Sequence, residues 1–287
     1  MSAMLDLTGR QRPVATDSAQ KDSATVRGAP TRRYTRRVAA ILLFVALWQA
    51  AVHIHLSLGF VTFANVPSPA DAIPALWTLL HSPKLPMHLA ASITRVLAGF
   101  CAAAVVGLGL GLAIVRYALL EDLLMPPLEM LRPIPAVAWI PLAILMFPSS
   151  EISMMFVTFI GALFPILLNT IHGVEAVDQR LIATARGLGT NSLSLYTEVI
   201  LPGAAPSIFT GLSIGMGTAW FCLVTAEMIA GQYGIGYYTW ESYTLQNYAD
   251  IVVGMALIGV LGMGSSMLIK RMGAALTPWY RRNGARR

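Results

Sequence analysis

Six long apolar runs, separated by short polar segments, dominate this 287-residue sequence. Each run has roughly the length of about 20 mainly apolar residues that a helix needs to cross a bilayer, or exceeds it. The runs are residues 38–58, 88–115, 126–147, 152–173, 206–230 and 251–269. Hydrophobic residues make up 56% of the chain and charged residues only 12%, which is too apolar for a soluble domain of this length. The sequence therefore predicts an all-α, polytopic membrane protein with six transmembrane helices.

Basic residues fall almost entirely on one side of these predicted helices. All but two of the 20 Lys and Arg residues lie in the two tails or in the loops that share their side. The exceptions are Lys84, in a segment on the opposite side, and Arg95, inside the second run. Because short loops rich in Lys and Arg stay in the cytoplasm, both termini are predicted to be cytoplasmic. The same topology explains the net charge of +6 without a nucleic-acid partner.

The predicted organisation follows from these runs. It consists of a disordered basic cytoplasmic tail (1–37), a first transmembrane helix (38–58), a periplasmic loop (59–87), a five-helix core (88–272) and a basic cytoplasmic tail (273–287). Within the periplasmic loop, residues 70–80 have the pattern of a short amphipathic helix. The glycines of the second run are not followed by Lys and Ser or Thr, so they do not form a phosphate loop. We expect Gly107 and Gly111 to allow close helix packing instead.

Prolines interrupt the third run. Pro133, Pro135 and Pro141 lie within it, and each proline in a helix frees a backbone carbonyl that a neighbour or a water-lined cavity must satisfy. Two interpretations remain open: a kinked helix that lines a pathway, or a static kink.

A polar segment, 177–202, separates the fourth and fifth runs. Asp178 is a good N-cap for a short amphipathic helix that carries Arg180 in its first turn. Gly189 then provides the left-handed residue that ends such a helix. Ala183, Thr184 and Ala185 form a face of small side chains, which suits close approach by another surface. From these residues alone, a socket for a partner protein and an ordinary loop on the bilayer are both possible.

The spacing in this segment resembles the EAA loop of importer permeases of the ATP-binding-cassette (ABC) superfamily. That pattern is Glu-Ala-Ala, three residues, Gly, nine residues, and Ile-x-Leu-Pro. Ala185, Gly189, Leu201 and Pro202 match it, whereas Ala183 replaces the glutamate, Thr184 the first alanine and Val199 the isoleucine. The segments at 66–69, 131–135 and 226–230 resemble the nitrate, sulfonate and taurine branch of these permeases. The resemblance covers roughly residues 38–280.

The resemblance implies a fold, partners and a function. The fold is that of a type I ABC importer permease in a bacterial inner membrane, with five core helices after the first. Two permeases would pair, receive a small anionic or polar solute from a periplasmic or lipid-anchored binding protein, and bind two cytoplasmic ATPase subunits. Those subunits would use ATP and Mg, and this chain would hold no cofactor or metal. The residues implied in ATPase coupling are Asp178, Arg180, Ala183, Thr184, Ala185, Gly189, Leu201 and Pro202.

The translocation path is predicted from polar and aromatic residues within apolar runs. A carboxylate in hydrocarbon is costly, so Glu227 is expected near the outer end of the fifth helix, facing protein or water. Arg95 is a possible partner for it, and Trp220 and Thr225 lie on the same helix as Glu227. A structural hydrogen bond that holds the outer loop is the alternative role for Glu227.

No nucleophile with a base, metal cluster or phosphate loop is evident in the sequence, so the chain itself is not expected to be an enzyme. Two other functions remain as alternatives: a motor-independent channel or secondary transporter, and a membrane scaffold that recruits a cytoplasmic partner. A secondary transporter generally needs ionisable residues near the membrane midplane, and Glu227 near an interface is a poor substitute for these.

Overall fold

The computed structural model describes residues 30–55, 57, 59, 63 and 65–280. It divides into two units, and the boundary along the chain falls between positions 64 and 65. The first unit contains helix α1 (Pro30–His53), which is apolar enough from Thr35 onward to span a membrane. The helix starts earlier and ends earlier than the predicted 38–58, because proline is favoured in a first turn and His55 adopts a positive φ of 46°. Residues 30–37 of the predicted disordered tail (1–37) belong to helix α1, and the rest of that tail, residues 1–29, lies outside the described residues.

The second unit is helical throughout its described residues. Its elements are α2 (Pro69–Leu80), α3 (Leu85–Arg116), α4 (Ala118–Leu131), η1 (Ala136–Trp139), α5 (Ile140–Met146), α6 (Ser150–Glu175), α7 (Gln179–Gly187), α8 (Ser192–Ser194), the π-helical turn η2 (Leu195–Ile200), α9 (Leu201–Ala230), α10 (Ile235–Thr244) and α11 (Tyr248–Leu276). Across both described units, five helices are long and apolar enough to cross a membrane, and a bent pair would make a sixth. The predicted all-α membrane fold is confirmed.

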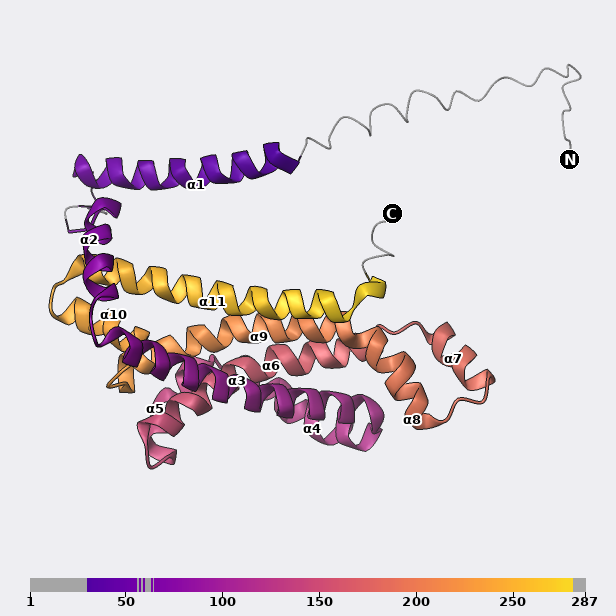
Figure 1. Cartoon of the computed structure of the whole chain (residues 1–287). Helices are drawn as coiled ribbons and strands as arrows, with labels where there is room; N and C mark the ends of the chain where they lie inside the picture. The colour runs from indigo at the N-terminus through magenta and orange to yellow at the C-terminus, as the bar shows by residue number, and fades with distance from the viewer. Residues whose placement is uncertain (1–29, 56, 58, 60–62, 64, 281–287) are drawn as a thin grey trace, which may run out of the picture. The chain divides into compact units, whose positions relative to one another are not determined.

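Helix α6 lies at the centre of the second unit, between α3 and α9 (Figure 1). The close packing predicted for the α3 glycines is present. A Cβ added at Gly107 would lie 3.0 Å from Cγ2 of Ile166, and one at Gly111 would lie 2.9 Å from Cβ of Thr170. The main apolar core runs through the same three helices and includes Trp220 of α9. Backbones that approach this closely hold the helices together by van der Waals contact, which is the main packing force inside a bilayer.

The third predicted span, 126–147, is broken. Helix α4 begins at Ala118, before the predicted start of this span at residue 126, and it ends at Leu131. The chain then bends by 90° into η1 and α5. Pro133 and Pro135 lie in the break, where their missing N–H groups and fixed φ angles prevent one continuous helix. The sequence therefore located the disruption, but it predicted a kink where the chain makes a sharp bend.

Two short helices cover the end of the bundle opposite α7 (Figure 1). Helix α2 confirms the helix predicted at 70–80, and a capping box starts it: Ser68 Oγ accepts from the Asp71 N–H at 3.2 Å while Asp71 Oδ2 accepts from the Ser68 N–H at 2.9 Å. The Ser68 hydroxyl donates to Asp71 Oδ2 at 2.7 Å, and this bond, together with the bond from the Ser68 N–H, lowers the pKa of the exposed Asp71 carboxyl. Helix α10 lies between the fifth and sixth predicted runs, where no helix was predicted from the sequence.

Candidate functional site

Helix α7 is capped as the sequence predicted. At its start, Asp178 Oδ1 accepts from the Arg180 N–H at 2.9 Å. At its end, Gly189 has a φ of +80°, and the Thr190 N–H donates to the carbonyl of Ala185 at 3.2 Å. This six-residue closure is the Schellman arrangement, which requires a left-handed residue at the position of Gly189. The short helix therefore has a defined start and stop, although it projects from the bundle (Figure 1).

The two faces of α7 differ. Ile182 and Ala185 pack against a cluster of buried apolar residues from the ends of α6 and α9. Ala183 and Thr184 are exposed, so the small residues predicted to share one face are divided between two. Two leucines on the free side, Leu181 and Leu188, are 59% and 82% exposed. An exposed apolar surface next to a firmly seated helix is typical of a protein docking site.

The remaining residues of the EAA-like pattern join α7 to the fifth span. Asn191 caps α8 by accepting the Ser194 N–H at 2.7 Å, and η2 leads into α9 without a break. Leu201 packs with the cluster behind α7. The carbonyl of Pro202 accepts from Trp279 Nε1 at 3.2 Å, which ties the start of α9 to the segment after α11. All eight residues predicted for coupling thus lie on α7, at its two caps or in the first turn of α9.

A cavity of about 520 Å³ lies behind α7. Its walls come from α7 and from the neighbouring ends of α3, α6 and the α8–η2 segment, and they include Arg116, Glu175, Arg186 and Tyr196. The guanidinium of Arg116 lies 6.0 Å from the centre of the Tyr196 ring, within range of a cation–π contact. Helix α7 is therefore supported on one side by the apolar cluster and borders open space on another.

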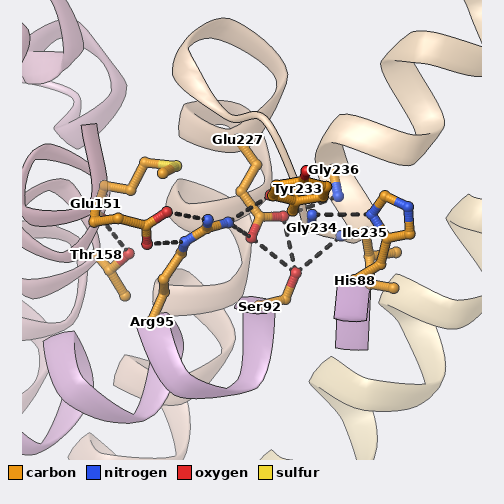
Figure 2. A network of polar contacts seen from close by, with 11 residues as sticks. His88, Ser92, Arg95, Glu151, Thr158, Glu227, Tyr233, Gly234, Ile235 and Gly236 are labelled. Carbon is orange, nitrogen blue, oxygen red and sulfur yellow. Dashed lines mark hydrogen bonds and ion pairs between the residues drawn. The ribbon is translucent and has the colours of Figure 1, made fainter. Parts of the chain in front are cut away.

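A buried polar network lies at the opposite end of the second unit (Figure 2). Arg95 of α3 and Glu227 of α9 are 2% and 0% exposed, and Arg95 Nη1 donates to Glu227 Oε1 at 2.9 Å. The pairing proposed from the sequence is confirmed. Glu227 also accepts from Ser92 Oγ at 2.8 Å and from the Gly236 N–H at 2.9 Å. A buried charge is tolerated when it is paired and hydrogen-bonded in this way.

The network also fixes the connection between α9 and α10. The carbonyl of Tyr233 accepts from Arg95 Nη1 at 2.6 Å, and the Gly234 N–H donates to His88 Nδ1 at 3.1 Å. The Ile235 N–H donates to Ser92 Oγ at 2.9 Å. Gly234 has a φ of +131°, and a side chain there would run into the carboxylate of Glu227. The predicted structural role of Glu227, holding this loop, is therefore visible in its contacts.

A second carboxylate reaches Arg95 from α6. Glu151 accepts from Arg95 Nε at 2.6 Å and from Nη2 at 2.5 Å, so one guanidinium joins three helices (Figure 2). The side chain of Glu151 is 55% exposed, whereas that of Arg95 is 3% exposed. Every buried side-chain nitrogen and oxygen of the described residues has a hydrogen-bond partner, so the network is complete.

Two of the predicted path residues stand outside this network. Trp220 is buried and its Nε1 donates to Ser265 Oγ at 2.9 Å, which joins α9 to α11. Thr225 Oγ1 donates to the carbonyl of Phe221 within α9 at 3.0 Å. Of the four predicted path residues, the structure brings together Arg95 and Glu227 only.

The sequence prediction missed His88, Ser92 and Glu151. A signal was present for the first two, since His88, Ser92 and Arg95 recur at i, i+4 and i+7 on one helix face. Glu151 lies in the first turn of α6, where an acidic residue is common for reasons of the helix dipole alone.

Comparison with known proteins places this architecture in a family. The family model described as "Binding-protein-dependent transport system inner membrane component" matches residues 103–282, which is more than half of the chain. The chain is 36% identical over 209 residues to the nitrate import permease protein NrtB of Synechocystis sp., covering 70% of this chain and 76% of that relative. It is 37% identical over 257 residues to SsuC of Escherichia coli, a permease protein named for the transport of aliphatic sulfonates, covering 88% and 96% of the two chains.

A third relative is the bicarbonate transport system permease protein CmpB of Synechococcus elongatus. It is 37% identical over 194 residues, which cover 67% of this chain and 68% of the relative. The family match, these relatives and the apolar spanning helices agree on a multi-pass protein of the bacterial inner membrane. This chain belongs to the binding-protein-dependent transport system inner membrane components, the permeases of ABC importers.

Proposed function

We propose that this chain forms the translocation path of an ATP-driven importer for a small oxyanion, and that α7 is the contact for its ATPase. The observation that carries the proposal is the α7 segment: a capped helix, seated on apolar residues, with an exposed face and the EAA-like spacing. ATP and Mg act in the ATPase subunits, and this chain needs no cofactor of its own.

The seating of α7 supports transmission of force. Ile182 and Ala185 pack against the cluster that contains Val174 of α6 and Ala204 of α9. A displacement of α7 would therefore be transmitted to both α6 and α9. A single helical run, from Ser192 to Ala230, then continues to Glu227 at the other end. Rigid elements that move as bodies about a few flexible points are a common way to couple distant sites. The π-helical turn η2 is a candidate for such a point.

The orientation and the assembly follow from charge and exposure. From the clustering of Lys and Arg in the tails and on the α7 side, we infer that α7 and both termini are cytoplasmic and that the α10 end is periplasmic. A binding protein then delivers solute at the α10 end. Two copies of the chain form the path between them, and exposed apolar residues such as Phe221 of α9 face the second copy or lipid.

The solute class rests on the relatives. Three of them are named for nitrate, aliphatic sulfonate and bicarbonate, and all three solutes are small singly charged oxyanions. Arg95 is the positive group buried at the proposed entry end.

Reconstitution tests this function. The chain is assembled in nanodiscs with the ATPase and the binding protein of its transport system, and ATP hydrolysis is measured over a panel of oxyanions. We expect hydrolysis to rise only when the binding protein carries its anion. A channel, a secondary transporter or a scaffold would give no hydrolysis that responds to the loaded binding protein, and this result would reject the importer.

A further inference from the structure

The guanidinium of Arg95 has two edges with different partners. Its Nη1 donates inward, to Glu227 Oε1 at 2.9 Å and to the Tyr233 carbonyl at 2.6 Å. Its Nε and Nη2 form the other edge, which points toward Glu151 (Figure 2). Parallel donation from two guanidinium nitrogens to two oxygens of one group is the geometry with which arginine binds carboxylates and other oxyanions.

The two carboxylates are held very differently. Glu227 is fully buried and is fixed by Ser92 and by the Gly236 N–H as well as by Arg95. Glu151 is more than half exposed, and within the described structure its carboxylate bonds to Arg95 alone. The ion pair between Arg95 and Glu227 is therefore expected to stay intact, because separating it would leave a buried charge without its partner. The Glu151 carboxylate, by contrast, can separate from the guanidinium and be hydrated by solvent.

The charge at the guanidinium would not change if an anion replaced the outer partner. Two carboxylates share one guanidinium, so the group carries one net negative charge. A singly charged anion that takes the place of the Glu151 carboxylate keeps that balance at the guanidinium. Nitrate, bicarbonate and a sulfonate each offer two oxygens to the same pair of N–H groups. Chloride offers only a point charge, which cannot reproduce the two parallel hydrogen bonds.

We propose that the Nε and Nη2 edge of Arg95 is an oxyanion-binding site, which the Glu151 carboxylate occupies in this conformation and the transported anion occupies in its turn. The second half of this statement rests on the proposed importer function. Glu151 is then a tethered competitor: it closes the site when no anion is present and withdraws to solvent when one arrives.

Anion binding to the purified full chain tests the site without the ATPase or the binding protein. The thermal unfolding midpoint in nanodiscs is measured in sodium nitrate, bicarbonate or methanesulfonate, against sodium chloride at equal ionic strength. The variants are wild type, Glu151→Ala, Glu151→Gln and, as a matched control, Glu129→Ala, which removes an exposed carboxylate of α4 outside the network. Removal of the competitor should lower the half-saturating oxyanion concentration at least tenfold in Glu151→Ala, while Glu129→Ala behaves as wild type.

Three results would overturn the site. Chloride could stabilise Glu151→Ala as well as nitrate does, the oxyanions could fail to stabilise it, or Glu129→Ala could gain the same response. A further variant combines Glu151→Ala with Arg95→Lys. It keeps the positive charge but lacks the two parallel N–H donors of the guanidinium, so it should lose the preference for oxyanions over chloride. If this double variant does not insert, the comparison of Glu151→Ala with Glu129→Ala decides alone.

The role of the site in transport is tested separately in the reconstituted importer. Acetate presents the same two oxygens as a glutamate side chain, so it should inhibit uptake by Glu151→Ala at concentrations at least tenfold below those that inhibit wild type. Oxyanion binding without such inhibition would place the site outside the path. An importer that takes up no anion at all would instead contradict the proposed function, and the binding result would stand.

Discussion

Arg95 of α3 and Glu227 of α9 lie 132 positions apart in the sequence, yet Nη1 of one donates to Oε1 of the other at 2.9 Å inside the packed bundle. The same carboxylate accepts the Gly236 N–H, so the pair also positions the start of α10. The end of the bundle that we assign to the periplasm is thus held by charge and hydrogen bonds, whereas its centre is held by close apolar packing.

Removal of the Glu227 carboxylate should destabilise the chain. In Glu227→Ala, Ser92 Oγ and the Gly236 N–H lose their acceptor and Arg95 loses its buried partner. We expect the free energy of unfolding in detergent to fall by about 3 kcal/mol or more. The control is Thr210→Ala on the same helix, whose exposed hydroxyl bonds only to the carbonyl of Pro206; it should change stability by less than about 0.5 kcal/mol. Equal effects of the two substitutions would show that the network contributes little.

A methyl group at Gly234 should disturb the same network from the loop side. Gly234→Ala must adopt a φ of +131° and place its Cβ against the Glu227 carboxylate, so we expect a loss of at least about 2 kcal/mol. Gly259→Ala on α11 is the control, because its Cβ would meet no atom within 4 Å and alanine favours a helix by about 1 kcal/mol over glycine. Thermal unfolding of the two variants should therefore shift in opposite directions. A harmless Gly234→Ala would contradict the close approach of the Gly234 backbone to the Glu227 carboxylate.

The spanning helices could be predicted from the sequence because the length and apolarity of each run determine where a helix crosses a bilayer. The ends of α7 were also predictable, since Asp178 and Gly189 act locally as caps. The Arg95–Glu227 pair was suggested by a simple argument: two ionisable groups in apolar runs need partners. Glu151 was missed as a partner of Arg95, because an acidic residue in the first turn of a helix is common and nothing in the local sequence shows that it will contact Arg95.

The bend after α4 shows a second limit. Pro133 and Pro135 mark a disruption, but whether two short helices then continue in line or at 90° depends on their packing against α6. Ser153 Oγ donates to the carbonyl of Ala143, one of the contacts that holds α5 in place. Such contacts form between two separate helices, and the helix propensity of each segment alone does not predict them.

The exposed apolar face of α7 should govern assembly with the ATPase. Leu188→Ser removes an 82% exposed leucine, so it should change the unfolding free energy by less than about 0.5 kcal/mol. Leu188→Ser should weaken the binding free energy for the ATPase by more than this, about 1–2 kcal/mol, which would appear as a roughly tenfold weaker affinity in pull-down titrations. Leu80→Ser, a 55% exposed leucine of α2 at the other end, is the control. A loss of ATPase binding in both variants would argue against α7 as the specific contact.

The C-cap of α7 should be needed for coupling. A Cβ added at Gly189 meets no atom within 4 Å, so Gly189→Arg should insert and fold; however, it strains the positive φ and projects a bulky cation from the coupling surface. We expect stimulated ATP hydrolysis and uptake to fall together to near background. Gly189→Asn tolerates the left-handed conformation better and should keep a large part of the activity. Unchanged hydrolysis and uptake in Gly189→Arg would reject the coupling role of this loop.

The most direct test of the importer function is ATP-driven accumulation of an oxyanion in proteoliposomes that contain the permease, its ATPase and the binding protein. ATP is supplied on the side of α7, and the anion and the binding protein on the side of α10. We predict accumulation that requires all of these components and is lost in Gly189→Arg. Equal uptake without ATP or without the binding protein would contradict an ATP-driven, binding-protein-dependent importer.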